Sequence, residues 1–445
     1  MHFSAEQVSN LHRLAPEIIL CLFGIVIMLL DPFLGRARQR ALGWVAFVGT
    51  LAAAASLRLM YLDQGYAYNE LIRADLFSIF AHAVVIGAAA LCVLGAINYL
   101  DDENLQRGEF YALVLFATAG MGILAGANEL LTAFVGLEMS IDQVQPVLDQ
   151  LIASGHLPAL SILGLALIFV GLGFKVVAAP FHIYGPDVYE GAPTPVTALL
   201  ASGPKAATFA LMLRIFYVAF PGEVHFWFWA IWGSAILTMF VGNLAAIVQS
   251  NVKRMLAYSS IAHAGYILVA FAAATVYGVS AVLFYLAAYT FMKVGAFLVV
   301  THLGQQDERH LEITDYAGLG TRQPALAVCF SLFLFSLLGL PATGGFLGKF
   351  FAFQAALDSH AAFGPAIVWL VIIAAINSVI GAYYYLRIII AMYFWEPSKD
   401  YTPSKVPLAV GTALAIAAIG TLYLGILPRD VLHAAFAAAT SLIAR

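Results

Sequence analysis

Four lysines lie inside or at the ends of long apolar stretches of this sequence: Lys175, Lys205, Lys293 and Lys349. A charged side chain at the centre of a membrane helix costs about 2.5–3.5 kcal/mol on insertion scales. We therefore expect each of these lysines to have a function or a binding partner inside the protein. Burial favours the neutral amine and a nearby carboxylate favours the ammonium, so a lysine between these influences can load and release a proton. The alternative is that the ammonium reaches the membrane surface on its aliphatic stem, and we favour this interpretation for Lys293.

Two histidines and a carboxylate accompany these lysines. His182 and His263 lie in or near apolar surroundings, and Glu138 lies in a short apolar segment at 130–141. Histidine titrates near neutral pH and can relay protons. A relay role is favoured for His182, which lies in an interrupted helix. For His263, a relay and a hydrogen-bonded packing role are both supported.

The composition indicates an all-α polytopic membrane protein. Of the 445 residues, 62% are hydrophobic and 10% are charged, whereas a soluble domain carries about 25% charged residues. Spans of roughly 20 apolar residues recur along the chain, which predicts about 12 to 13 transmembrane helices and no sizeable soluble domain. The N-terminus has no basic segment before its first apolar run, so we expect no cleaved signal peptide. Helices are predicted near 15–34, 41–61, 76–100, 110–127, 158–182, 203–221, 226–248, 256–274, 276–302, 324–341, 365–395 and 406–427.

Two segments rich in proline and glycine interrupt the helical pattern, at 175–195 and at 340–349. Irregular backbone at membrane depth is tolerated where it is buried in protein or lines a wet cavity, and paired broken helices are a pointer to the ion site of a transporter. The pieces at 193–202 and 345–358 are predicted to be the second halves of the broken helices. Asp187 and Glu190 in the first break are interpreted as helix caps or partners of basic groups, with proton uptake as the alternative.

The breaks divide the chain into two repeats with flanking helices. The predicted units are 1–109 (N-terminal helices), 110–221 (a first, incomplete repeat), 222–395 (a second repeat) and 396–445 (a C-terminal helix and tail). The first repeat is incomplete because 130–141 gives about 18 Å of helix, too short to cross a core of about 30 Å. Basic residues gather in four loops that fall on one side, which should be cytoplasmic.

Several classes of function are not supported. A net charge of −4 gives no nucleic-acid footprint. Cys21, Cys92 and Cys329 lie in separate apolar runs and form no C-x-x-C pair, so no disulfide framework, iron–sulfur cluster or zinc site is indicated. No phosphate-binding G-x-x-x-x-G-K-[ST] loop is present. The histidines show no clear pairing as axial ligands of haem.

Several motifs resemble subunit N of bacterial NADH-quinone oxidoreductase, respiratory complex I. The most specific is Pro186-Asp-Val-Tyr-Glu-Gly-Ala-Pro-Thr-Pro-Val196. The others are Leu137-Glu138, Phe174-Lys175, Ala179-Pro-Phe-His182, Lys253-Arg-Met-Leu-Ala-Tyr-Ser-Ser-Ile-Ala-His263 and Gly344-Gly-Phe-Leu-Gly-Lys349. The resemblance covers most of the chain. Subunits L and M and multisubunit Na⁺/H⁺ antiporters share the fold but typically carry a different string at 186–196.

The resemblance implies that the two repeats are inverted and antiporter-like. It also implies a proton-translocating role in the membrane arm, with Glu138 and Lys175 as a charge pair. Lys205 and His263 would continue a polar axis, and Lys349 would pass the proton to the outer half-channel. Lys293 matches no family hallmark. The family pattern also implies an internal deletion after Ser140, which removes the end of one helix and a following helix that bears a further lysine.

The resemblance further implies that this chain binds no cofactor, since NADH, FMN, iron–sulfur clusters and quinone belong to the complex. Its partners would be other membrane-arm subunits and the lipid bilayer of the bacterial inner membrane. Two alternatives stay open: a stand-alone cation/proton antiporter, and a non-pumping structural subunit.

Overall fold

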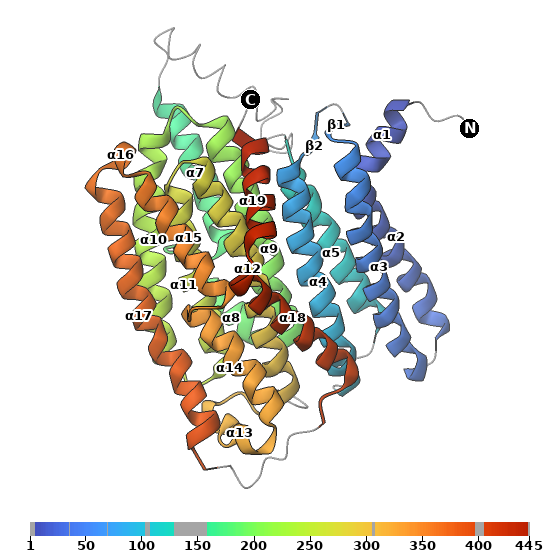
Figure 1. Ribbon diagram of the computed structural model, residues 1–445. Helices are drawn as coiled ribbons and strands as arrows, with labels where there is room; N and C mark the ends of the chain where they lie inside the picture. Colours follow the sequence, from blue (N-terminus) through green and yellow to red (C-terminus); the bar gives the residue numbers. More distant parts are fainter. Residues whose placement is uncertain are drawn as a thin grey trace.

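The computed structural model describes residues 5–34, 36–68, 70–102, 107–128, 158–304, 308–396 and 405–443. In these ranges the chain is a bundle of α-helices with one antiparallel hairpin of two short strands, β1 (Gly65–Ala67) and β2 (Ile72–Ala74) (Figure 1). Ten of the described helices are long and apolar enough to cross a membrane. The predicted all-α polytopic membrane fold is confirmed, and the predicted count of about 12 to 13 spans is approximate.

The helices follow one another closely along the chain. The first group is α1 (Ala5–Arg13), α2 (Ala15–Leu30), η1 (Asp31–Phe33), α3 (Arg36–Leu62), α4 (Leu76–Asp102) and α5 (Gly108–Gly126). The second is α7 (Pro158–Val176), α8 (Tyr184–Gly191), α9 (Thr194–Arg214), η2 (Ile215–Ala219), α10 (Val224–Ile247), α11 (Val252–Ala272) and α12 (Val276–Gly304). The third is η4 (Ile313–Tyr316), α13 (Leu319–Arg322), α14 (Pro324–Leu338), α15 (Gly344–Asp358), α16 (His360–Phe363), α17 (Pro365–Phe394), α18 (Leu408–Ile426) and α19 (Arg429–Ile443).

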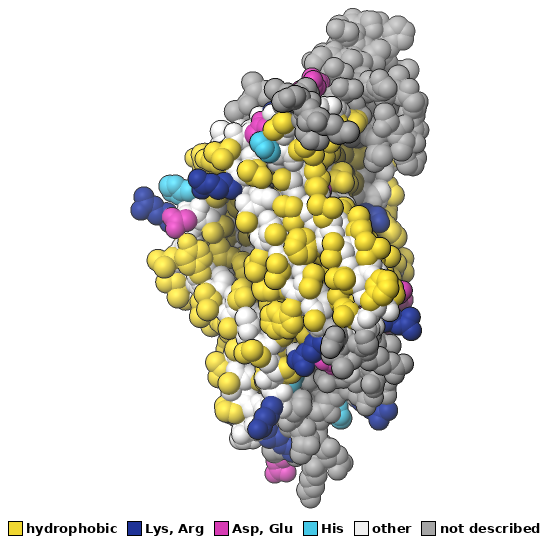
Figure 2. All heavy atoms as spheres, turned by 90° about the vertical axis from the view of Figure 1, so that its right-hand side faces the viewer, with side chains coloured by type: hydrophobic (Ala, Val, Ile, Leu, Met, Phe, Trp, Pro, Cys, Tyr) yellow, Lys and Arg dark blue, Asp and Glu magenta, His cyan; other side chains and the backbone are white. Residues whose placement is uncertain are grey.

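Helices α11 and α12 form the centre of the bundle. In the most apolar stretch of 18 residues in each helix, 94% of the stretch is buried inside the protein. The corresponding fraction is 28% in α2 and 33% in α3 and α17. The outer helices expose leucine, isoleucine and valine instead, and Figure 2 shows a broad hydrophobic surface on the side of α2 and α3, with charged side chains mostly toward its ends. This surface suits hydrocarbon, so polar groups on α11 and α12 must find partners inside the protein.

The described parts of the predicted basic loops lie at one end of the bundle. The start of α3, α13 and the end of α17 share this end, whereas α1, the β-hairpin and the end of α19 lie at the other (Figure 1). The start of α11 belongs to the same end as η4, because the Val252 amide donates to the Leu311 carbonyl at 2.7 Å. The assignment of this end to the cytoplasm stays a prediction from charge.

Two predicted boundaries are wrong. The pieces predicted at 193–202 and 203–221 form the single helix α9, and the second half of the first broken helix is α8. Pro204 lies inside this helix and has no amide to donate to the carbonyl four residues earlier. That carbonyl, Leu200 O, instead accepts a hydrogen bond from the Tyr189 hydroxyl at 3.3 Å, so the helix continues. The predicted C-terminal tail also contains a helix, α19.

Candidate functional site

The first break joins α7 to α8 and is held by the neighbouring helix α10. The Ala179 amide donates to the Thr238 hydroxyl at 2.8 Å, and the Ser234 hydroxyl donates to the Ala179 carbonyl at 2.7 Å. At the end of α7, the Tyr184 hydroxyl donates to the Phe174 carbonyl at 2.8 Å. Backbone groups that lose their helical partners are therefore satisfied by side chains, as membrane depth requires.

The second break joins α14 to α15, and the side chain of Lys349 on α15 binds the end of α14 across it. The Lys349 ammonium donates to the carbonyls of Leu337 and Leu338, at 3.2 and 2.9 Å, and to the Ser378 hydroxyl at 2.8 Å. The two carbonyls are at the C-terminus of α14, where carbonyls lack helical donors and attract positive charge. The ammonium also lies 4.7 Å from the centre of the Tyr266 ring.

Lys205 of α9 is buried against α11 and α12. Its ammonium donates to the carbonyl and the hydroxyl of Ser260, at 2.6 and 2.8 Å, and the Tyr289 hydroxyl donates to the same Ser260 hydroxyl at 2.7 Å. The residue is 1% exposed, so its ammonium does not reach the membrane surface.

Lys293 of α12 is wholly buried, so the expectation that it reaches the membrane surface is wrong. Its ammonium donates to the Leu256 carbonyl at 2.5 Å and to the Ser259 hydroxyl at 2.9 Å. The aliphatic stem cannot reach solvent because α12 lies at the centre of the bundle rather than at its surface.

From Lys293 a hydrogen-bonded path runs through three helices. The Ser259 and Tyr385 hydroxyls lie 2.6 Å apart, and the Tyr385 hydroxyl lies 3.2 Å from His263 Nε2. His263 Nδ1 is in turn 2.9 Å from the Tyr285 hydroxyl. Each hydroxyl and the imidazole can both donate and accept a proton, so these contacts can pass one along.

We call this set the central polar chain. Its members are Lys205, Ser260 and Tyr289, then Lys293, Ser259, Tyr385, His263 and Tyr285, then Tyr266 and Lys349. In the described part of the chain, no aspartate or glutamate forms an ion pair with Lys205, Lys293 or Lys349. Like charges in a low-dielectric interior repel strongly, so the arrangement disfavours three ammonium groups at once.

Two predicted site residues lie apart from this chain. Lys175 is exposed at the end of α7, a helix that also exposes the apolar side chains of Leu167 and Val170. His182 is half-buried in the first break and forms no hydrogen bond to the central polar chain. Glu138 lies outside the described residues, as does the short segment at 130–141.

Ion pairs fasten the first break to α11. Arg254 binds Glu190 at 2.5 Å and Asp187 at 3.3 Å, so both carboxylates have the basic partner that was expected. Lys253 donates to the Ala192 carbonyl at 2.5 Å and to Glu308 at 2.6 Å. These contacts fix the end of α8 against the helix that carries Ser259, Ser260 and His263.

Glu308 was not predicted and is the centre of this junction. It accepts hydrogen bonds from the amide and hydroxyl of Thr194, at 2.7 and 2.6 Å, and from the Tyr99 hydroxyl at 3.0 Å. Burial alone would raise the pKa of Glu308, but attraction to Lys253 and the hydrogen bonds from Lys253 and Thr194 hold the pKa below its ordinary value of 4.5.

Helical spacing contains a signal for the residues that were missed. Tyr285, Tyr289 and Lys293 are four residues apart on α12, and Ser259, His263 and Tyr266 are four and three apart on α11. Such spacings place side chains on one face of a helix. No local signal identifies Tyr385, because α17 is largely exposed and only the fold turns this tyrosine inward.

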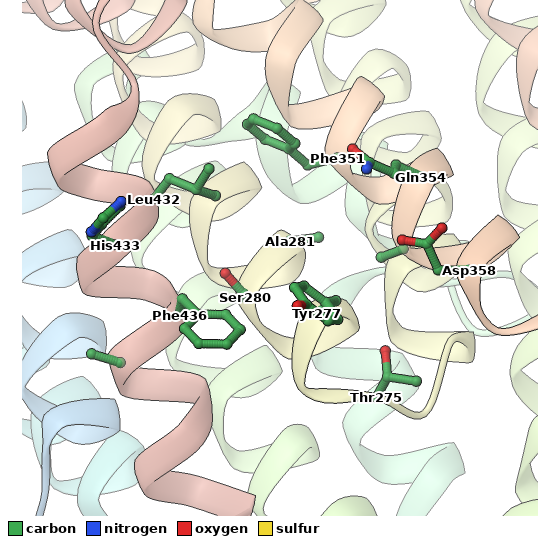
Figure 3. A pocket seen from close by; sticks show the side chains of 12 residues that line it. Thr275, Tyr277, Ser280, Ala281, Phe351, Gln354, Asp358, Leu432, His433 and Phe436 are labelled. Atoms are coloured by element: carbon green, nitrogen blue, oxygen red, sulfur yellow. The ribbon is translucent and has the colours of Figure 1, made fainter.

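A separate cavity of about 980 Å³ lies between α12, α15 and α19 (Figure 3). Its walls include Tyr277, Phe351 and Phe436, with Gln354 and Asp358 among its polar side chains. None of its lining residues belongs to the central polar chain. In the described part of the chain, no group of three or more histidine, cysteine, aspartate or glutamate residues could hold a metal ion.

The chain matches a family model described as NADH:quinone oxidoreductase/Mrp antiporter, transmembrane, over residues 74–381. It is 40% identical over 479 residues to NADH-quinone oxidoreductase subunit N 1 of Solibacter usitatus, with 97% of each chain covered. This chain belongs to the NADH-quinone oxidoreductase subunit N family. Subunit N 2 of Koribacter versatilis is also 40% identical, over 487 residues and 97% of each chain.

A solved structure supports the membership of this chain in the subunit N family. A chain of respiratory complex I from Thermus thermophilus with bound aureothin is 32% identical, with a TM-score of 0.74 over 94% of this chain and 98% of that one. The resemblance found in the sequence motifs is thereby confirmed. Both alignments with the relatives are longer than the 445 residues of this chain, so these relatives carry residues with no counterpart here.

Proposed function

We propose that this chain is a membrane-arm subunit of NADH-quinone oxidoreductase and takes part in proton translocation coupled to electron transfer from NADH to quinone. The observation that carries the proposal is the central polar chain, which joins Lys293 to His263 and Tyr285 through hydrogen bonds of 2.6–3.2 Å in a buried interior. Membership in the subunit N family supports the same role.

In this proposal the lysines hold the proton and the hydroxyls conduct it. A proton that leaves the Lys293 ammonium passes to the Ser259 hydroxyl, then through Tyr385 to His263 Nε2. The imidazole releases a proton from Nδ1 to Tyr285. The first transfer neutralises Lys293, and repulsion from the remaining ammonium groups drives the proton onward.

Lys349 occupies the outer end of the proposed route. Its ammonium is stabilised by two carbonyls at the C-terminus of α14 and by the face of Tyr266. If α14 moves relative to α15, the ammonium loses both carbonyls together. We propose that this change releases its proton, since a buried ammonium without acceptors is costly.

The first repeat would supply a second route through Glu138, Lys175 and His182. The family pattern assigns Glu138 as the partner of Lys175, and the exposed position of this lysine leaves it accessible to a carboxylate. The electron carriers NADH, FMN, iron–sulfur clusters and quinone would bind to other subunits of the complex. We place the assembly in the bacterial inner membrane, where quinone reduction and proton translocation are coupled.

Substitution of Lys349 tests the proposal. Lys349→Ala should lower proton translocation per electron in the reconstituted complex more than it lowers assembly. The matched control is Lys405→Ala, which removes an exposed lysine near α18. Loss of assembly with unaltered translocation per assembled complex would contradict the relay role of Lys349.

A non-pumping structural role is the second candidate, and the length of the alignments favours it. The relatives carry residues that this chain lacks, and the family pattern places the missing helix, with its lysine, after Ser140. Purification from native membranes and mass determination decides whether a 47.7 kDa chain assembles. Absence of proton translocation by that assembly would establish the structural role, whereas cation/proton exchange by the chain alone would indicate an antiporter.

A further inference from the structure

Helices α2 and α4 bury a carboxylate and an imidazole in direct contact, away from the central polar chain. Glu17 Oε1 lies 2.5 Å from His82 Nε2. Glu17 is 5% exposed and His82 is 2% exposed. Both residues are in the first two turns of their helices, at the end of the bundle with α1 and the β-hairpin (Figure 1). None of the roles proposed above uses this pair.

The hydrogen bonds of His82 define how many protons the pair carries. Its Nδ1 lies 2.6 Å from the Ser78 carbonyl, which can only accept, so Nδ1 bears a hydrogen. A carboxylate oxygen and a bare imidazole nitrogen are both acceptors and do not approach to 2.5 Å without a proton between them. The pair therefore holds one proton between Oε1 and Nε2, and its net charge is zero.

The surroundings leave this proton as the main stabilisation of Glu17. In the described residues no donor reaches the other carboxylate oxygen, Oε2. A side chain at Gly122 of α5 would collide with the pair, since its Cβ would lie 2.7 Å from Glu17 Oε1 and 2.9 Å from His82 Nε2. If the proton leaves, a buried charge of −1 remains with one oxygen unpaired, which is costly.

Contacts connect the pair to α9, the helix that carries Lys205. Ser78, whose carbonyl binds His82, donates its amide to Asp75 at 2.8 Å. Asp75 accepts two bonds from Arg214 of α9, at 3.1 and 3.2 Å. Arg214 and Lys205 are about two and a half turns apart on that helix.

We propose that Glu17 and His82 form a proton-binding site that takes up and releases one proton, and that its occupancy is linked through Asp75 and Arg214 to α9. Uptake places the proton between Oε1 and Nε2, and release returns it to the aqueous phase at the end of the bundle that holds α1. The site goes beyond the proposed route through α11, α12 and α17, because it shares no residue with it.

The charges around the pair determine the pH at which it releases its proton. The charge of Asp75 acts on His82, and Asp75 is also bound by Arg73 at 3.2 Å. Cys21 lies one turn further along α2, and α5 faces the pair with Gly122. On α1, His12 and Arg13 are held by Asp63, and Arg58 of α3 is exposed.

Infrared difference spectroscopy of the protein with its partner subunits tests the site, since it detects protonated carboxyl groups and needs no proton pumping. Wild type should show a pH-dependent carboxyl band that is absent in Glu17→Gln, which keeps the shape and a donor for His82. His82→Gln should retain the band with a shifted titration midpoint. A spectrum in which Glu17→Gln loses no titrating signal would overturn the proposal.

Two glycines on one helix provide a matched control. Gly122→Ala places a methyl group against the pair, whereas Gly120→Ala on the same helix meets no atom within 4 Å. We expect Gly122→Ala to move the titration midpoint and Gly120→Ala to leave it unchanged. Equal spectra for the two variants would contradict the location of the signal at this pair.

The link to α9 predicts shifts of opposite sign. Asp75→Asn removes a negative charge that favours the bound proton, so release should occur at lower pH. Arg214→Gln leaves Asp75 less neutralised, so release should require higher pH. Shifts of the same sign in both variants would overturn the link. The proposed pumping function can fail without affecting these spectra, so the two proposals are tested separately.

Discussion

The hydroxyls of Ser259 and Tyr385 lie 2.6 Å apart and join α11, which is almost wholly buried, to α17, which is largely exposed. Tyr385 is 2% exposed because it lies on the inner face of α17 with Asn377 and Tyr384. Its hydroxyl also reaches His263, so it is the single described atom that connects the Lys293 side of the central polar chain to the imidazole. Two halves of the proposed route therefore depend on one oxygen.

Removal of that oxygen should interrupt proton transfer. Tyr385→Phe keeps the ring and its packing, and it should slow proton translocation through this route by about 10²-fold, the lower range for a positioned proton-transfer group. The loss of its two hydrogen bonds should cost about 2 kcal/mol of stability. Proton uptake by proteoliposomes during quinone reduction measures the effect.

The neighbouring tyrosine provides the control for this variant. Tyr384 is equally buried, but its hydroxyl donates to Asn243 at 3.0 Å and forms no hydrogen bond to the His263 imidazole. Tyr384→Phe should lose similar stability and keep translocation. Equal translocation in the two variants would show that the Tyr385 hydroxyl is not on the route.

Lys293 should be needed for proton transfer and dispensable for folding. Lys293→Met replaces a buried amine by an apolar chain of similar length, which removes a cost of about 2.5–3.5 kcal/mol for a charge at a helix centre. Thermal unfolding in detergent should therefore show an unchanged or higher Tm, while proton translocation falls. If Lys293 reached the membrane surface, its substitution would change neither the Tm nor proton translocation. Unaltered translocation would therefore support a surface-reaching lysine.

The spans and breaks could be predicted from the sequence because each has a local cause. Apolar length predicts a membrane helix, and Pro and Gly at 175–195 and 340–349 predict irregular backbone. The boundary predicted between 202 and 203 was wrong, because the carbonyl that Pro204 leaves without a helical donor is bound by Tyr189, a residue in a different helix. Local rules do not include partners from elsewhere in the chain.

The candidate site was predicted only in part, again because local rules do not include partners from elsewhere in the chain. Lys205, His263 and Lys349 carry an energetic cost that is visible in the sequence, and the fold places all three in the central polar chain. Tyrosine and serine carry no such cost, so Tyr385 and Ser259 gave no signal alone. The error on Lys293 arose because a sequence does not reveal whether a helix is central or peripheral.

The junction at Glu308 should make stability depend on pH. Its folded-state pKa is lowered, so its contribution is present above the ordinary carboxyl value of 4.5 and is lost as the pH falls through the folded-state value. Glu308→Gln should cost about 3 kcal/mol at pH 7, because it leaves the buried Lys253 without its counter-charge. The difference in Tm between wild type and variant should shrink below pH 4.5. A difference that is constant with pH would contradict the ion pair.

The second break should tolerate no side chain at Gly345. A Cβ there would lie 1.9 Å from the Ser336 carbonyl oxygen and 2.9 Å from the Met292 sulfur, and the carbonyl belongs to the backbone of α14, which cannot yield without moving the break. Gly345→Ala should therefore destabilise the protein by about 1–3 kcal/mol or more.

Gly233→Ala on α10 meets no atom within 4 Å, so it should stabilise by about 0.5–1 kcal/mol through helix propensity. Because α15 also carries Lys349, only Gly345→Ala should lower proton translocation per assembled complex. Unchanged translocation despite a lower Tm would show that the contacts of Lys349 with the carbonyls of Leu337 and Leu338 do not set the rate.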